Sequence, residues 1–271
     1  MPELPEITCR AREMREELVG RTITGVEVLQ PKCLNVPPER FVERLTGGTI
    51  EDVSYHGKWI FVETTRGYLL LNMGMGGEIL LVTRKSLPEK RRLVFDFDDG
   101  TCLSINFWWF GYAHYTPLDA LDSHAMTAKQ GPDALDVTAE ELKAMLDGRR
   151  GRIKSFLLDQ SKIAGIGNAY VHDILFLARL HPLRQVNTMS DTEIEALANA
   201  IHHGLRPSIE AGGAFYEVNL YGKPGGFTAE NLLVGYREGK PCPVCGTTIE
   251  KIKTGSTAGF ICPQCQPLEP K

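Results

Sequence analysis

Apolar and polar residues alternate along most of the chain between Thr22 and Tyr115, where β-branched residues are frequent and glycines recur at short intervals. A period of two is typical of strands that bury one face against a core. The pattern therefore predicts a strand-rich domain, folded as an antiparallel sandwich or barrel. The predicted strands span residues 22–29, 48–55, 59–64, 68–71, 78–82, 93–97 and 101–105.

The residues on either side of this stretch have the spacing of helices. Between residues 3 and 18, apolar residues recur at intervals that bury one helix face. Further along the chain, two pairs with the spacing of a capping box mark helix starts. The predicted helices span residues 3–18, 139–146, 153–160, 168–178 and 190–203, and the capping boxes pair Thr138 with Glu141 and Ser190 with Glu193.

The length of 271 residues is enough for two domains, each with its own core. The change from strand to helix pattern falls at residues 117–136, a stretch that contains Pro117 and Pro132. No apolar run is long enough to cross a membrane, and the N-terminus lacks the apolar core of a secretory signal, so a cytoplasmic protein is expected. A net charge of −4 argues weakly against a nucleic-acid partner, but basic residues gather at 84–92 and 149–154, so charge leaves the partner open.

Four of the seven cysteines form two Cys-x2-Cys pairs separated by sixteen residues: Cys242 with Cys245, and Cys262 with Cys265. This is the spacing of a tetrahedral zinc site. A redox dithiol is the competing interpretation, but a Cys-x2-Cys motif of that kind rarely has a twin at this distance. Four thiolates leave no open coordination position, so the zinc ion is expected to be structural.

The N-terminus carries candidate chemistry. Removal of Met1 leaves Pro2 as a free secondary amine with Glu3 beside it. A terminal amine has a lower pKa than a lysine side chain, so an appreciable fraction is unprotonated at neutral pH and can attack an electrophilic carbon. The alternative is an ordinary flexible terminus.

A glycine-rich turn lies in the helical part of the chain. Gly165 and Gly167 permit backbone conformations that other residues avoid, and Asn168 is suited to cap the helix that follows. A helix start behind such a turn can bind phosphate through its backbone N–H groups. An ordinary pair of helices joined by a tight turn explains the same residues equally well.

Several motifs, taken together in this order, resemble the formamidopyrimidine-DNA glycosylase/endonuclease VIII family over essentially the whole chain. They are Pro-Glu-Leu-Pro-Glu at 2–6, His-Gly-Lys at 56–58, Leu-Leu-Asp-Gln at 157–160, Gly-Ile-Gly-Asn-Ala-Tyr at 165–170, His-Pro at 181–182, Tyr-Arg-Glu-Gly-Lys-Pro-Cys at 236–242, and the four-cysteine finger.

The resemblance implies an α+β fold: an N-terminal antiparallel β-sandwich domain at 1–130, a helix-two-turns-helix domain at 131–235 and a zinc finger at 236–271. It implies a monomeric DNA repair enzyme, cytoplasmic and nucleoid-associated in a bacterial cell, that binds double-stranded DNA containing a damaged base or an abasic site. The implied activity is that of a bifunctional glycosylase and abasic-site lyase, which flips the damaged nucleotide out of the helix.

The resemblance also assigns roles to residues. Pro2 is the expected nucleophile that attacks the sugar C1′, Glu3 moves protons during ring opening, and Lys58 acts on the opened intermediate or holds a phosphate. Glu6 supports the site. Lys154 and Asn168 are expected to bind backbone phosphates, and Lys223 lies in a segment that falls where the family has a loop contacting the lesion. β-elimination, with or without δ-elimination, then cuts the strand.

The sequence departs from the family pattern at two places. Met75 and Phe110 match the loop that fills the space left by the flipped base, but Trp108 and Trp109 replace two arginines. Stacking on an indole is indifferent to base identity, so a relaxed preference for the opposite base is expected. One tryptophan packing into the sandwich core is the alternative. Thr257 stands where the zinc hairpin usually has an arginine, and this change is not conservative.

Three functions are therefore compared. The intact nucleophile, acid and zinc ligands favour an active glycosylase and lyase. The two departures favour a divergent member that binds damaged or abasic DNA without efficient base excision. A zinc-stabilised scaffold or RNA-binding protein without chemistry leaves Pro2, Glu3 and Lys58 unexplained.

Overall fold

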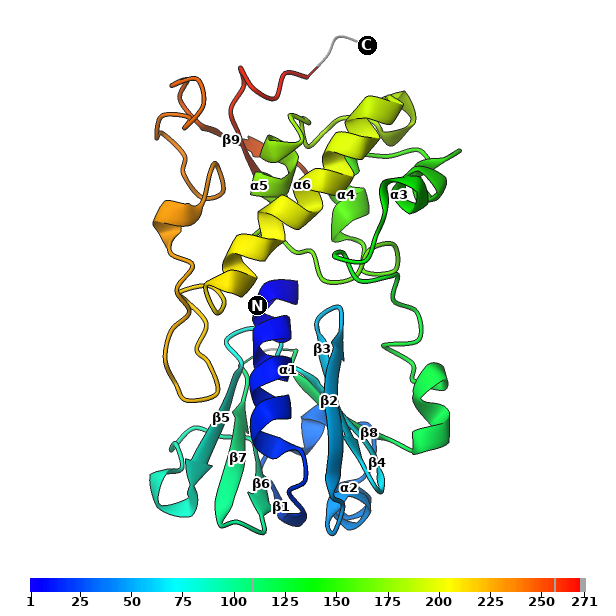
Figure 1. Cartoon of the computed structure of the whole chain (residues 1–271), viewed down its shortest axis with the longest axis vertical. Coiled ribbons are helices and arrows are strands. Elements are labelled where there is room, and N and C mark those ends of the chain that lie inside the picture. The colour runs from blue at the N-terminus through cyan, green and yellow to red at the C-terminus, as the bar shows by residue number, and fades with distance from the viewer. Residues whose placement is uncertain (109, 256, 269–271) are drawn as a thin grey trace. The chain divides into compact units, whose positions relative to one another are not determined.

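The computed structural model describes residues 1–108, 110–255 and 257–268, and its ribbon is shown in Figure 1. The chain divides into two compact units. The first comprises Met1–Lys129 together with Ala211–Gly226, and the second comprises Gln130–Glu210 together with Phe227–Lys271. No helix among the described residues is both long enough and apolar enough to span a bilayer.

The first unit contains two four-stranded antiparallel sheets, with strand orders β1-β6-β7-β5 and β2-β3-β4-β8. Their apolar faces and helix α1 enclose one hydrophobic core. The predicted sandwich in an α+β protein is thereby confirmed. The strands are β1 (Ile23–Val28), β2 (Ile50–His56), β3 (Trp59–Thr64), β4 (Gly67–Asn72), β5 (Glu78–Thr83), β6 (Leu93–Phe97), β7 (Thr101–Asn106) and β8 (Tyr112–Thr116), and the helices are α1 (Leu4–Leu18) and α2 (Pro38–Leu45).

Helix α1 begins with a reciprocal capping box. The Glu3 side chain accepts from the backbone of Glu6, and the Glu6 carboxylate accepts from the Glu3 backbone N–H at 2.9 Å. All residues from 4 to 11 are buried, whichever side of the helix they lie on. The capping box therefore fixes Pro2 and Glu3 at the end of a helix that is itself held in the core.

The segment Ala211–Gly226 packs with the first unit, whereas the expected boundaries placed it in a domain at 131–235. The Arg10 guanidinium donates to the carbonyls of Ile79 and Val218, so it joins α1 to β5 and to this segment. Leu220 is fully buried in the sandwich core, and its carbonyl accepts from the Leu81 N–H at 2.9 Å.

The second unit contains the helices α3 (Ala139–Leu146), α4 (Ile153–Leu158), α5 (Val171–Leu177) and α6 (Asp191–Glu210), and the two-stranded sheet β9 (Glu250–Lys253) and β10 (Ala258–Ile261). Both predicted capping boxes are present, at the starts of α3 and α6. Helix α5 begins at Val171, with Tyr170 as its cap residue. The expectation that Asn168 caps this helix is therefore wrong, because the turn continues for two further residues.

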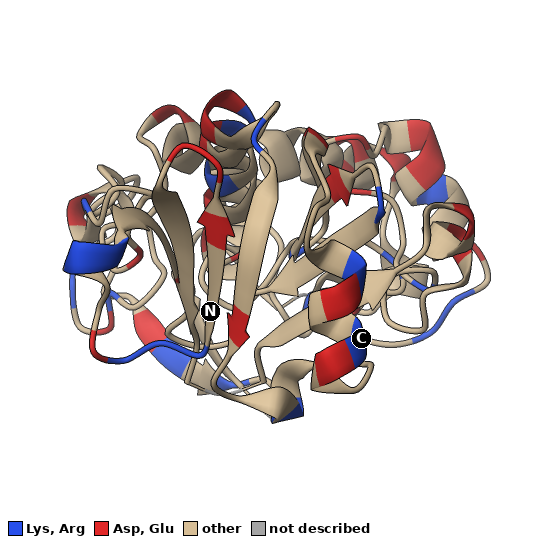
Figure 2. Cartoon of the chain, turned by 90° about the horizontal axis from the view of Figure 1, so that it is seen from below, with Lys and Arg blue, Asp and Glu red and all other residues tan. Residues whose placement is uncertain are grey.

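Short 3-10 helices are present at Pro31–Cys33, Arg84–Ser86, Leu118–Ser123, Val186–Thr188 and Ala229–Asn231. Basic and acidic residues are interspersed along the ribbon (Figure 2). This mixture accounts for a net charge close to balance despite the local basic stretches.

Candidate active site and metal centre

Three predicted site residues gather around the N-terminus in the first unit. Glu3, Glu6 and Lys58 are 3%, 6% and 9% exposed, and Pro2 is also buried. Burial lowers the pKa of Lys58, and the carboxylates of Glu3 and then Glu6 oppose that shift. A buried lysine with a lowered pKa beside two carboxylates is a candidate for proton transfer.

The local fold explains how Lys58 reaches this place. It occupies the two-residue turn between β2 and β3, where His56 pairs with Trp59. Gly57 has a φ of +58°, the left-handed conformation that such a tight hairpin requires of its first central residue. The carbonyl of Lys58 accepts from the Asn72 side chain at 3.1 Å, which fixes the turn to β4.

Glu217 is a member of this group that the sequence did not reveal. Its carboxylate Oε1 lies 3.6 Å from the N-terminal amine of Met1, and its side chain is 11% exposed. The same loop is joined to α1 by the Ala214 N–H, which donates to Glu6 Oε1 at 3.2 Å. The sequence pointed only to Lys223 in this loop, because a single glutamate carries no motif.

Met75 and Trp108 are brought together in the first unit. The Trp108 N–H donates to the Met75 carbonyl at 3.1 Å, and the two side chains are 52% and 66% exposed. The Trp108 ring lies against Gly76, where an added Cβ would stand 3.0 Å from it. Phe107, at 4% exposed, takes the core position, so Trp108 is not the tryptophan that the alternative places in the core.

Two other predicted residues belong to the same unit. Phe110 is 74% exposed and has a φ of +55°, which is unusual for a residue other than glycine. Lys223 is exposed in a turn that Asn219 holds by accepting from the Lys223 N–H at 2.8 Å. Trp109 lies outside the described residues.

Lys154 lies in the second unit beneath the β9–β10 hairpin, and it is 2% exposed. Its Nζ donates to the Thr254 and Thr257 hydroxyls, both at 3.0 Å, and to the Ala258 carbonyl. Burial lowers the pKa of Lys154 to about 8. All three N–H bonds of the ammonium group are therefore directed at the hairpin rather than at solvent.

Asn168 is half-buried in the same unit and contacts Tyr236. The Asn168 Nδ2 donates to the Tyr236 hydroxyl at 3.2 Å, and that hydroxyl lies 3.3 Å from the Asn168 carbonyl. The start of the finger segment is fixed nearby, because Asp173 of α5 accepts from the backbone N–H groups of Leu233, Val234 and Gly235.

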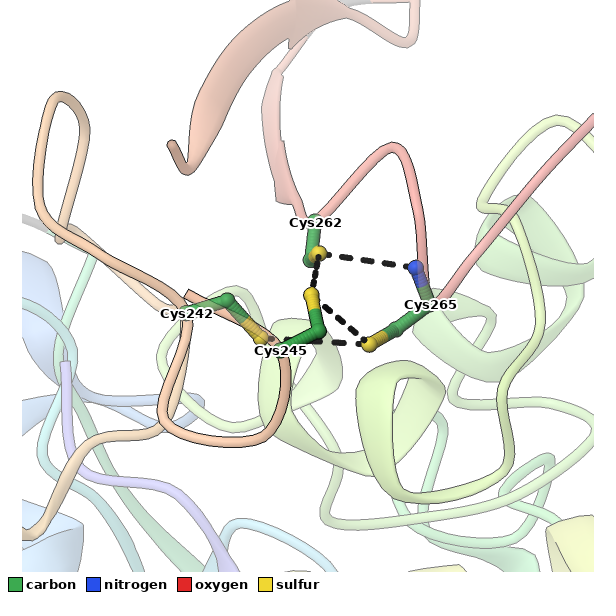
Figure 3. A group of neighbouring side chains, drawn as sticks. All are labelled: Cys242, Cys245, Cys262 and Cys265. Atoms are coloured by element: carbon green, nitrogen blue, oxygen red, sulfur yellow. Dashed lines mark hydrogen bonds between the residues drawn. The ribbon is translucent and has the colours of Figure 1, made fainter. Parts of the chain in front are cut away.

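The four cysteines of the finger converge on one point (Figure 3). Their Sγ atoms all lie within 4.8 Å of one another, and neighbouring pairs are 3.4 to 3.8 Å apart. A zinc ion with Zn–S bonds of about 2.3 Å requires sulfur atoms about 3.8 Å apart. Backbone N–H groups of Val244 and Cys265 point at two of the sulfurs at 3.4 Å, as suits thiolates. The donor set therefore fits one structural zinc ion.

Three family profiles match successive parts of the chain. Residues 1–106 match the formamidopyrimidine-DNA glycosylase N-terminal domain, residues 130–219 match the H2TH domain of the same enzyme, and residues 239–268 match the zinc finger found in FPG and IleRS. Together they cover most of the chain.

Individual proteins are similar over nearly the whole length. The formamidopyrimidine-DNA glycosylase of Chloroflexus aurantiacus is 38% identical over 98% of both chains, and that of Pelotomaculum thermopropionicum is 36% identical over 99% of this chain and 100% of its own. The Lactococcus lactis Fpg in complex with abasic-site DNA superposes with a TM-score of 0.90 at 30% identity, covering 98% of this chain and all of that one. The chain therefore belongs to the formamidopyrimidine-DNA glycosylase family.

Proposed function

We propose that the chain is a base excision repair enzyme, a bifunctional DNA glycosylase and abasic-site lyase that acts on double-stranded DNA as a monomer. The observation that carries the proposal is the buried group of Pro2, Glu3, Glu6 and Lys58 at the start of α1. The relatives support it, since solved structures of similar proteins contain DNA with an abasic site or a Fapy-dG lesion. In a bacterial cell, the enzyme acts in the cytoplasm on the nucleoid.

The proposed reaction begins once Met1 has been removed. The Pro2 nitrogen attacks C1′ of the flipped nucleotide, and the bond from C1′ to the damaged base breaks. Glu3 donates a proton to the sugar ring oxygen as the ring opens, and an imine joins Pro2 to the sugar. Lys58, whose pKa is lowered by burial, acts on the opened intermediate or holds a phosphate. β-Elimination from this intermediate then breaks the strand.

Residues of both units are assigned to DNA binding. Asn168 is proposed to donate to a backbone phosphate, and Lys223 offers an exposed cation. Lys154 is proposed to act through the hairpin, because its Nζ is bound to Thr254, Thr257 and the Ala258 carbonyl. Its charge then polarises the Thr257 hydroxyl, which takes the place of the missing arginine, while the Thr254 hydroxyl donates to the Thr257 carbonyl at 2.8 Å.

A divergent member that cleaves abasic sites without efficient base excision is the second candidate. It is favoured by the hairpin turn, where Thr257 carries no charge and the Lys154 ammonium group is buried against the hairpin. The zinc ion has no chemical step in either case, because four thiolates complete its coordination.

Borohydride trapping on a panel of duplexes separates these functions. The panel carries an abasic site, 8-oxoguanine, formamidopyrimidine or an oxidised pyrimidine, each opposite all four bases. Covalent adducts on base-containing lesions support glycosylase activity and identify the damaged base that is the substrate. Adducts on the abasic duplex alone support the lyase-only candidate, and the absence of any adduct contradicts both.

The exposed indole of Trp108 predicts weak discrimination between opposite bases. A stacking wedge is indifferent to sequence, whereas an arginine donates hydrogen bonds to particular bases. We expect the trapping rate of the unmodified protein to vary less between the four opposite bases than that of Trp108→Arg. Trp108→Ala should weaken binding by roughly 5- to 150-fold, the equivalent of about 1–3 kcal/mol of stacking. Unchanged affinity in Trp108→Ala would rule out the wedge, and Trp108→Tyr serves as the aromatic control.

A further inference from the structure

Backbone hydrogen bonds fix the position of Glu217 in its loop. Its N–H donates to the Ala214 carbonyl at 3.0 Å, and its own carbonyl accepts from the Gly225 N–H at 3.1 Å. Gly225 permits this approach, because an added Cβ would stand 2.1 Å from the Gly213 carbonyl oxygen. Since the Ala214 N–H also donates to Glu6, the loop is fixed to the start of α1.

The carboxylate of Glu217 is directed at the chain terminus. Oε1 lies 3.6 Å from the Met1 amine, and the side chain is largely buried. Removal of Met1 transfers the terminal amine to Pro2, the adjacent residue, and consecutive Cα atoms are about 3.8 Å apart. Glu217 therefore supplies the carboxylate of this loop that contacts Met1, the residue next to the proposed nucleophile.

The charges around Glu217 suit a group that gains and loses a proton. Burial raises the pKa of Glu217 to about 7, and the Glu6 carboxylate acts in the same direction. The terminal ammonium and Arg10 both act to lower this pKa. Arg10 is itself engaged, since it donates to the carbonyls of Ile79 and Val218 and pairs with Glu13 at 3.5 Å. Burial thus favours the neutral carboxyl group, and the terminal ammonium favours the ionised carboxylate.

We propose that Glu217 is the catalytic base that accepts the proton of the N-terminal nitrogen as the imine forms. This inference rests on the proposed function. The N–C1′ bond forms while the bond from C1′ to the leaving group breaks, and the leaving group takes that electron pair and then a proton from water. The nitrogen loses its N–H proton to the Glu217 carboxylate, and the C1′–O4′ bond then opens with the proton that Glu3 supplies. No oxidant or reductant takes part.

A simple ion pair makes the opposite prediction. If Glu217 only stabilised the protonated amine, its removal would lower the pKa of the amine and leave more of it free to attack at neutral pH. The reaction would then become faster. If Glu217 is the base, its removal makes the reaction slower even where the amine is already unprotonated.

The test measures single-turnover imine formation on an abasic-site duplex between pH 5 and 9, trapped with borohydride. For the unmodified protein, the rate should rise with pH through about 7, as the Glu217 carboxylate becomes ionised. Glu217→Gln should be slower by roughly 10²- to 10⁴-fold at pH 7.5, the range of a lost general base. Added formate should restore the rate of Glu217→Ala in proportion to its concentration, while Glu217→Asp retains part of the activity.

The matched control is Glu13→Gln. Glu13 holds the same loop by accepting from the Leu220 N–H at 2.9 Å, but the N-terminal amine is not among its partners. Glu13→Gln should keep the pH profile of the unmodified protein. An unchanged or faster reaction in Glu217→Gln would overturn the inference and leave the proposed function standing. Absence of an adduct with the unmodified protein would instead overturn the proposed function itself.

Discussion

A chain extended by several residues ahead of Pro2 should form no borohydride-stable adduct with abasic-site DNA. In that chain, the Pro2 nitrogen is part of a peptide bond, and its lone pair is delocalised into the carbonyl. Glu3, Glu6 and Lys58 remain in the sequence, so the loss isolates the nucleophile. We expect trapping to fall by roughly 10³-fold or more, as when an enzyme loses its nucleophile.

The same extension placed after the last residue is the control, and it should leave trapping unchanged. Intact-mass measurement must show that the control protein begins at Pro2. Covalent trapping by the N-terminally extended chain at the rate of the control would contradict the role of Pro2. A protease site immediately before Pro2 adds a second check, because cleavage there should restore the adduct.

Removal of zinc should strongly weaken DNA binding. Among the described residues, strands β9 and β10 have four residues each and pair only with one another, and an isolated hairpin of this size is not stable in water. Structural zinc contributes about 10–16 kcal/mol to the folding of comparable finger peptides. When the hairpin unfolds, Lys154 loses the Thr254 and Thr257 hydroxyls that accept from it.

We expect Cys262→Ala, or treatment with a chelator, to weaken binding to a duplex with a stable abasic-site analogue by at least about 100-fold, which is about 2.7 kcal/mol. Fluorescence anisotropy measures the affinity, and added zinc should restore it after chelation. Cys102→Ala is the matched control, because Cys102 is a buried cysteine of β7 in the other unit. Retention of full affinity by a zinc-free chain would show that the hairpin is dispensable.

The sequence was sufficient to predict elements whose pattern is local. The strands from β1 to β7 follow from alternation, and the starts of α3 and α6 follow from their capping boxes. Helix α2 and strand β8 were not predicted, because both are short and neither has a long periodic run. The packing of Ala211–Gly226 with the first unit depends on Arg10 and on the burial of Leu220, which are long-range contacts without a sequence signature.

The same difference between local patterns and long-range contacts applies to the candidate site. Motif spacing identified the zinc ligands, and the four sulfurs do converge. The roles of Pro2, Glu3 and Lys58 stay predictions, although the structure brings the three into one buried group. Sequence reasoning did not anticipate that Lys154 is enclosed by the hairpin or that Glu217 faces the terminal amine, because both facts arise from residues about 100 or more positions apart.

The role of Pro2 as the nucleophile is tested most directly by identifying the protein atom that becomes covalently attached to DNA. The protein is trapped on an abasic-site duplex with borohydride, digested with nuclease and protease, and the N-terminal peptide is sequenced by tandem mass spectrometry. We expect the sugar remnant to be attached to the nitrogen of Pro2 in a peptide that lacks Met1. A remnant on Lys58 or on any other lysine, with Pro2 unmodified, would contradict this expectation.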